Sequence, residues 1–208
     1  MQWECGAGAE GKGQADDGQQ RGDEENRLLQ GSGRYHGYSV PTIISHPAVV
    51  LLQPRATPAR VTVAAVVATI LPDLDTIGFA YGIPYGSPYG HRGFTHSIAF
   101  AVAGAALLTL ATRRDGRTFA LLFLCALSHP LLDAFTNGGR GVALFWPFSD
   151  HRYFAPWRPI EVSPIGRLSL SVLWSEAKWV WLPAIAIRAL RLRGRRPQAS
   201  AAAPAGRN

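Results

Sequence analysis

Histidines and aspartates gather in three short motifs of this chain, and each motif stands at the end of an apolar run. Imidazole and carboxylate groups without thiolates suit Zn²⁺ or Mn²⁺. Three aspartates with three or four histidines exceed one tetrahedral shell, which leaves room for two ions or for residues that orient the ligands. The pattern predicts a divalent-metal site. The motifs are Pro72–Asp75, His91–Ser97 and Ser128–Asp133, with an aromatic fourth at Phe145–Phe148.

The third motif shows the geometry best. His129 and Asp133 are four residues apart, so a helix places them on one face. They close a strongly apolar segment, and an ionisable pair at membrane depth is costly and functional by default. We therefore expect His129 and Asp133 at the centre of the site.

The other candidates each have an alternative role. Asp73 and Asp75 are ligands if a turn brings them together, or else they cap a following helix. A lone histidine is usually structural, but His91 and His96 lie only five residues apart at the mouth of an apolar run. His46 joins them from the N-terminal segment, whereas His36 and His151 receive no role.

Four apolar runs must position these residues. They cover about residues 57–71, 94–112, 119–134 and 170–190, and most are slightly short of the roughly 20 residues of a bilayer crossing. The alternative to membrane helices is a soluble all-α bundle. Arginines decide between them, because four crossings from the cytoplasm put three arginine groups on one side, as the positive-inside rule asks. All ligand candidates then fall on the opposite, extracytoplasmic face. The three groups are Arg55 with Arg60, the turn 113–117, and the cluster 188–196.

Composition limits the remaining possibilities. The chain has 208 residues, 47% of them hydrophobic, and a net charge of +7. A basic chain can bind nucleic acid, but the arginine placement favours a lipid bilayer as the partner instead. Cys5 and Cys125 lie far apart, which argues against disulfides and against a cysteine-based zinc site. Residues 1–39 and 195–208 are predicted to be disordered tails around a membrane-embedded domain, residues 40–194.

The motifs together resemble those of the bacterial YdjM-type membrane-bound metal-dependent hydrolases. The resemblance covers about Val40 to Leu190 and rests on Leu-Pro-Asp-Leu-Asp, His-Arg-Gly-Phe-Thr-His-Ser, Ser-His-Pro-Leu-Leu-Asp and Trp-Pro-Phe in that order. Ser45-His46-Pro47 matches the histidine near the start of such proteins. The resemblance implies an all-α bundle of about four membrane-embedded helices in the inner membrane. It also implies a distant similarity to zinc phospholipase C and the P1 nucleases, and with it phosphodiester chemistry.

The predicted activity is metal-assisted hydrolysis of a phosphodiester or lipid-type substrate. A bound divalent ion, Zn²⁺ or Mn²⁺, activates a water molecule. Asp73 or Asp75 remains free as general base, and Arg92 or Arg140 holds a phosphate. For Arg92 the alternative is a solvated or headgroup-bound side chain. Two other functions stay open: a non-catalytic membrane protein with a structural metal cluster, and a metal-independent lipid phosphatase with a histidine nucleophile. No nucleic-acid partner is expected, and the ligand set is His46, Asp73, Asp75, His91, His96, His129 and Asp133.

Overall fold

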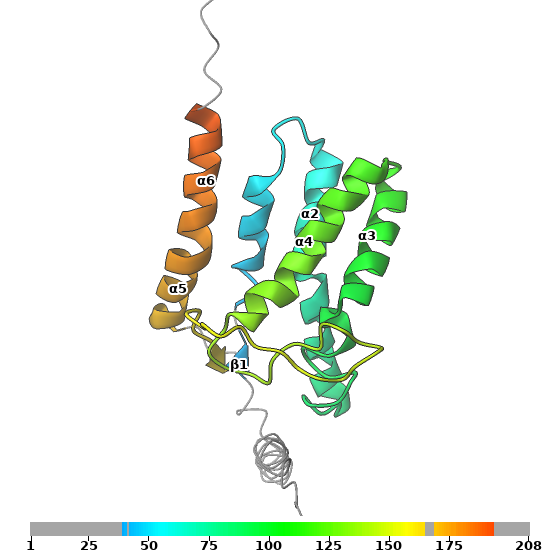
Figure 1. Ribbon diagram of the computed structural model, residues 1–208, viewed down its shortest axis with the longest axis vertical. Helices are drawn as coiled ribbons and strands as arrows, with labels where there is room; N and C mark the ends of the chain where they lie inside the picture. Colours follow the sequence, from blue (N-terminus) through cyan, green and yellow to red (C-terminus); the bar gives the residue numbers. More distant parts are fainter. Residues whose placement is uncertain (1–38, 41, 165–168, 194–208) are drawn as a thin grey trace, which may run out of the picture. The chain divides into compact units, whose positions relative to one another are not determined.

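A computed structural model describes residues 39–40, 42–164 and 169–193 (Figure 1). The predicted tails, and His36, lie outside these residues except for Ser39, which belongs to the first strand. The described part is helical, as predicted. Its elements are β1 (Ser39–Val40), η1 (His46–Leu52), α2 (Ala59–Ile70), η2 (Leu71–Tyr81), η3 (Phe94–His96), α3 (Ile98–Thr112), α4 (Gly116–Ala134), β2 (Ser163–Pro164), α5 (Leu170–Glu176), η4 (Ala177–Trp181) and α6 (Leu182–Arg193).

Helices α2, α3 and α4 form the main core. Their contact surface is built largely from small side chains, which let neighbouring helices approach closely, as is common in membranes. Ser97 caps α3 by accepting a hydrogen bond from Phe100 N, and Asp115 caps α4 by accepting one from Thr118 N. The core residues include Ala64, Ala65, Ala68, Ala101, Ala105, Leu122, Cys125 and Ala126.

A second, smaller cluster joins η1 to the C-terminal helices. Helix α5, the π-helical η4 and α6 follow one another without a break, and Ala48 of η1 packs with Val180 and Ala184. Glu176 accepts hydrogen bonds from the backbone N and Oγ1 of Thr42, just before η1. At the other end of η1, Arg188 donates hydrogen bonds to the carbonyl oxygens of residues 51 and 53. The C-terminal helices therefore hold η1, and with it His46, from both ends.

The segment after Pro72 differs from the prediction. The sequence predicts that the first apolar run ends at about residue 71, but the chain continues as the 3-10 helix η2 to Tyr81. Pro72 lacks an N–H and so ends the α-helical hydrogen bonding of α2. It sits in the first turn of η2, where that N–H needs no partner. The first apolar run is thus α-helical only as far as Ile70, and the chain stays helical through Pro72.

Two helical stretches among the described residues are long and apolar enough to cross a membrane. They are Ala59–Tyr81, which joins α2 to η2, and Gly116–Ala134; Ile98–Thr112 is apolar but shorter. Only 33% and 44% of the two apolar windows are buried, whereas the core helix of a soluble protein is mostly buried. Leu107, Leu110 and Leu124 are each more than half exposed. Apolar side chains facing outward are what a lipid-facing bundle requires.

Candidate metal centre

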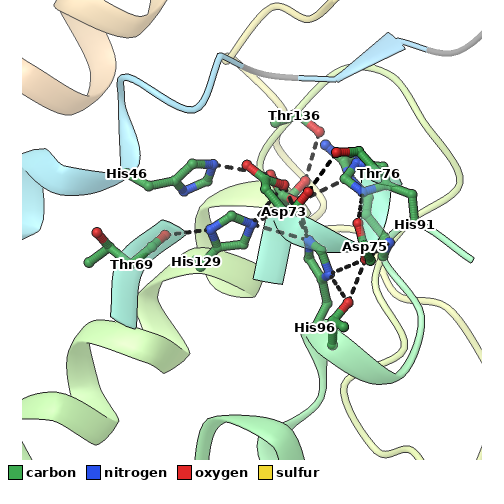
Figure 2. Close-up of polar contacts among 12 residues, drawn as sticks. His46, Thr69, Asp73, Asp75, Thr76, His91, His96, His129 and Thr136 are labelled. Atoms are coloured by element: carbon green, nitrogen blue, oxygen red, sulfur yellow. Dashed lines mark hydrogen bonds and ion pairs between the residues drawn. The ribbon is translucent and has the colours of Figure 1, made fainter. Parts of the chain in front are cut away.

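Four side chains from three elements converge on one point next to the loop region. Asp73 comes from η2, His96 from η3, and His129 and Asp133 from α4, and one ligand atom of each lies within 4.8 Å of the others. Figure 2 shows the two imidazoles directed toward the aspartates. His96, His129 and Asp133 are fully buried, and Asp73 is 11% exposed. The predicted convergence of the three motifs is therefore seen in the structure.

The spacing of these atoms fits a tetrahedral ion. Ligand bonds of roughly 2.0–2.2 Å place tetrahedral ligands about 3.4 Å apart. The Nε2 atom of His129 lies 3.1 Å from that of His96 and 3.3 Å from Asp73 Oδ1. Asp133 Oδ2 lies 3.1 Å from His96 Nε2 and 3.8 Å from His129 Nε2. The longest of these separations, 3.9 Å, joins His96 Nε2 to Asp73 Oδ1.

Both imidazoles are held by their other nitrogen. His129 Nδ1 lies 2.6 Å from the carbonyl oxygen of Thr69. A carbonyl only accepts, so Nδ1 carries the proton and Nε2 of the neutral ring has a free lone pair. His96 Nδ1 lies 3.3 Å from the Asp75 carboxylate, which fixes its ring in the same sense. Carboxylate or carbonyl partners of this kind orient metal-binding histidines.

Asp75 occupies a different place from Asp73. A 3-10 helix has three residues per turn, so side chains two apart diverge by about 120°. Asp75 Oδ1 lies 2.6 Å from His91 Nδ1, and Oδ2 accepts hydrogen bonds from Thr95 Oγ1 at 2.5 Å and Arg92 N at 3.2 Å. Both oxygens are thus engaged in positioning the 91–96 segment. Asp75, His91 and His96 also form a second group whose spacing could hold an ion.

Arg92 is fully buried, which overturns the solvated or headgroup-bound alternative. Its Nε forms an ion pair with Asp133 Oδ2 at 3.0 Å, and its Nη1 donates to the carbonyl oxygen of Gly138 at 3.0 Å. Nη2 has no hydrogen-bond partner among the described residues. The backbone of Arg92 has φ +62, an uncommon value for a residue other than glycine.

His46 lies at the edge of the four-residue group. Its ring stacks on His129 with centroids 3.7 Å apart, and its Nε2 is 3.8 Å from Asp133 Oδ1 (Figure 2). It is 1% exposed, and neither ring nitrogen has a hydrogen-bond partner in the described part. Burial and the neighbouring His129 lower the pKa of His46 to about 3, so its imidazole is neutral and can act as a ligand.

The two histidines of the segment 91–96 differ in charge. Burial lowers the pKa of His91 despite the adjacent Asp75 carboxylate. Burial also acts against a charged His96, but hydrogen bonds to Asp133 and Asp75 outweigh it and raise the pKa to about 9. When no metal ion is bound, the protonated His96 therefore supplies the positive charge beside the Asp133 and Asp75 carboxylates.

Several supporting groups could not be recognised from the sequence. They are a main-chain carbonyl, a short hydroxyl and an arginine far along the chain, and none of these carries a sequence signal of metal binding. Thr69 contributes its carbonyl oxygen, and Thr95 contributes its hydroxyl. Arg152 donates from Nη1 to the carbonyl oxygen of His91 and from Nη2 to those of residues 85 and 87, which ties two loops together. Arg140 and His151 are not among the four converging residues.

Comparison with known proteins identifies the family. The sequence model of the YdjM inner membrane protein family matches residues 42–196, so the chain belongs to that family, as the motifs predict. The chain is 39% identical over 160 residues to the inner membrane protein YbcI of Escherichia coli K12, across 69% of this chain and 92% of YbcI. No solved structure matches. The distant similarity to zinc phospholipase C and the P1 nucleases therefore stays a prediction.

Proposed function

We propose that this chain is a multi-pass inner-membrane hydrolase that uses a divalent ion, Zn²⁺ or Mn²⁺, to cleave a phosphodiester or lipid-type substrate. One observation carries the proposal. The Nε2 atoms of His96 and His129 face each other at 3.1 Å, each with a partner at Nδ1, and the carboxylates of Asp73 and Asp133 join them. Once a metal ion displaces the proton on His96 Nε2, all four groups present lone pairs to one point, and such a point needs a cation.

Three of the four residues would hold the ion. A catalytic site keeps one coordination position open, and three protein ligands are typical. His96, His129 and Asp133 are the buried members and would be these ligands. A bound ion of this kind lowers the pKa of its water to about 7 and polarises the scissile group. His46 and His91, the remaining predicted ligands, would join only through a second ion or a shift of the ring.

The remaining side chains would handle protons and charge. Asp73 is the most exposed member of the group, and it would accept a proton from the attacking water as general base. Asp75 would keep His96 in the orientation that directs Nε2 inward. Arg92 has a free Nη2 that would bind a phosphate oxygen.

The bonds made and broken then balance. The water oxygen forms a bond to phosphorus, and the bond from phosphorus to the departing alkoxide oxygen breaks. One proton of the water leaves through Asp73 and reaches the departing alcohol. The other stays on the phosphate monoester.

A structural metal clamp is the second candidate, and full burial of three members favours it, because structural zinc sites are closed by four protein ligands. One experiment separates the two. Purified protein is freed of metal, reloaded with Zn²⁺ or Mn²⁺, and tested on phosphodiester and phospholipid substrates beside Asp73→Asn. We expect metal-dependent hydrolysis that Asp73→Asn abolishes while metal content stays near one ion per chain. Stoichiometric metal without hydrolysis of any substrate would favour the clamp.

A further inference from the structure

We infer that the substrate is a membrane phospholipid whose phosphodiester reaches the cluster from within the bilayer, and not a water-soluble diester. The inference rests on the proposed function and adds the source of the substrate. Three observations support it: the depth of the ligands along their helices, the apolar residues outside them, and the loops that cover the cluster from the other side.

The depth follows from helix geometry. Helix α2 begins beside Arg60, and α4 begins beside Arg113, Arg114 and Arg117, at the same end of the bundle in Figure 1. At 1.5 Å per α-helical and 2.0 Å per 3-10 residue, Asp73 lies about 24 Å from the start of α2. His129 and Asp133 lie about 20 and 26 Å from the start of α4.

A hydrocarbon core of about 30 Å therefore extends beyond the cluster if the arginine-flanked ends mark its cytoplasmic boundary. The cluster then lies a few ångströms inside the outer boundary of the acyl chains. Tilt of the helices shortens their vertical reach and moves the cluster deeper. That level is adjacent to phospholipid headgroups and away from bulk water.

The outward faces of the ligand-bearing helices are apolar at this level. On η2 the threefold repeat turns Asp73 and Asp75 inward, while Leu74 and Ile77 share the third face at 54% and 57% exposure. On α4, Leu131 lies two residues from His129, close to the opposite side of the helix, and is 45% exposed. The helices carry no outward charge between Leu71 and Tyr81 or between Thr118 and Ala134. Acyl chains would cover these residues, because both stretches belong to candidate membrane spans.

Loops close the cluster on its other side. His91 and Arg92 are fully buried, and Ala143 N donates to the carbonyl oxygen of Arg92 at 3.0 Å. Val142 is also fully buried, and the guanidinium of Arg152 bonds three carbonyl oxygens of the segment 85–91. The loop side is thus cross-linked by hydrogen bonds to main-chain carbonyl oxygens, whereas only lipid would cover the helix side.

The experiment compares one headgroup presented in two ways. Metal-loaded full-length protein in lipid nanodiscs receives either a long-chain phospholipid in the bilayer or a short-chain, water-soluble analogue with the same phosphodiester. The variant Leu74→Gln/Ile77→Gln alters the apolar face of η2, and Leu107→Gln on α3, 68% exposed in the native chain, is the matched control. We expect kcat/KM on the bilayer lipid to fall about tenfold or more in the η2 variant, with the analogue and the control little changed.

A second experiment measures how deep position 131 of α4 lies in the bilayer, and its result does not depend on enzymatic activity. A spin label at Leu131→Cys, in a Cys5→Ser background, should be accessible to dissolved oxygen and shielded from a water-soluble nickel complex. Exposure of this label to the nickel complex overturns the inference, and so does faster turnover of the soluble analogue with no effect of the η2 variant. If a shielded label accompanies no hydrolysis of either substrate, the proposed function has failed and the placement in the bilayer has not.

Discussion

Replacing Asp75 by asparagine tests whether this residue orients the centre or binds the ion. The Asp75 carboxylate faces four donors: His91 Nδ1, His96 Nδ1, Thr95 Oγ1 and Arg92 N. An asparagine keeps one acceptor oxygen and turns an NH₂ group toward either His91 alone or the other three donors. With the NH₂ group toward His91, that neutral ring must move its proton to Nε2, which is buried without a partner among the described residues. With the NH₂ group toward the other three donors, at least one buried pair of donors faces each other.

The size of the effect follows from the position of Asp75. It supports His96 and is not among the four residues, His129 included, whose ligand atoms converge on one point. Loss of such a supporting group lowers metal affinity about 10–100-fold, which is about 1.4–2.7 kcal/mol. Removing a ligand, as in His129→Ala, should instead abolish stoichiometric binding.

Competition with a chromophoric chelator gives the affinities of purified protein for Zn²⁺. Asp150→Asn is the control, because Asp150 is an exposed aspartate of the loop region and should bind as wild type does. An unchanged affinity for Asp75→Asn would refute the orienting role. A loss as complete as that of His129→Ala would show that Asp75 is itself a ligand.

Four further predictions concern stability, pH, topology and the tail. Arg92→Met removes the guanidinium partner of the buried Asp133 and should lower the free energy of unfolding by about 3–5 kcal/mol, whereas Arg158→Met, at an exposed position, should change it little. Chemical unfolding in detergent measures both, and equal values would refute the buried ion pair. Because the pKa of His96 is about 9, its Nε2 carries a proton at pH 7 that metal must displace, so affinity should rise about tenfold per pH unit up to about pH 9; calorimetry in buffers of different ionisation enthalpy should detect about one proton released per ion, and no release would contradict it. Reporter fusions after Gly116 and after Gly139 should lie on opposite sides of the membrane, the first in the cytoplasm, and a shared side would reject the four-crossing topology. Deletion of residues 1–38, which stops short of β1 and of the family match at residue 42, should leave membrane insertion and metal content unchanged, and loss of either would show that the tail is needed.

The parts of the site that follow helical periodicity could be predicted from the sequence. His129 and Asp133 share a face because their spacing is one helical turn, whatever surrounds them. The alternating direction of the apolar runs brings the ends of the first and third and the start of the second to one surface. Those two facts are enough to place three motifs together.

The different roles of Asp73 and Asp75 could not be predicted from the sequence. It depends on whether residues after Pro72 are extended, α-helical or 3-10, and the first two would have directed Asp73 and Asp75 differently. The burial of Arg92 could not be predicted either, because an arginine next to an apolar run has the sequence pattern of a residue at the membrane surface. Its ion pair with Asp133 connects residues 41 positions apart, and only the tertiary structure shows it.

The arginine bias becomes clearer once burial is known. Arg92 and Arg152 count against the positive-inside pattern in the sequence, but the first pairs with Asp133 and the second with backbone carbonyls. Neither is a free surface charge at the end of the bundle that carries the cluster. In contrast, Arg55, Arg60 and Arg113 are exposed at the other end. Burial thus removes two of the arginines that count against the predicted topology, whereas Arg158 in the loop region stays exposed, and the reporter fusions test the topology itself.

X-ray absorption spectroscopy of the zinc-loaded, purified protein tests the central claim most directly, because it reports the ligands of the ion itself. The proposed centre predicts a shell of nitrogen and oxygen at about 2.0–2.2 Å, with the outer scattering of two imidazole rings and no sulfur. His129→Ala should remove that spectrum. A sulfur shell, or a spectrum of solvated zinc that is identical in His129→Ala, would contradict the metal centre and the hydrolase built on it.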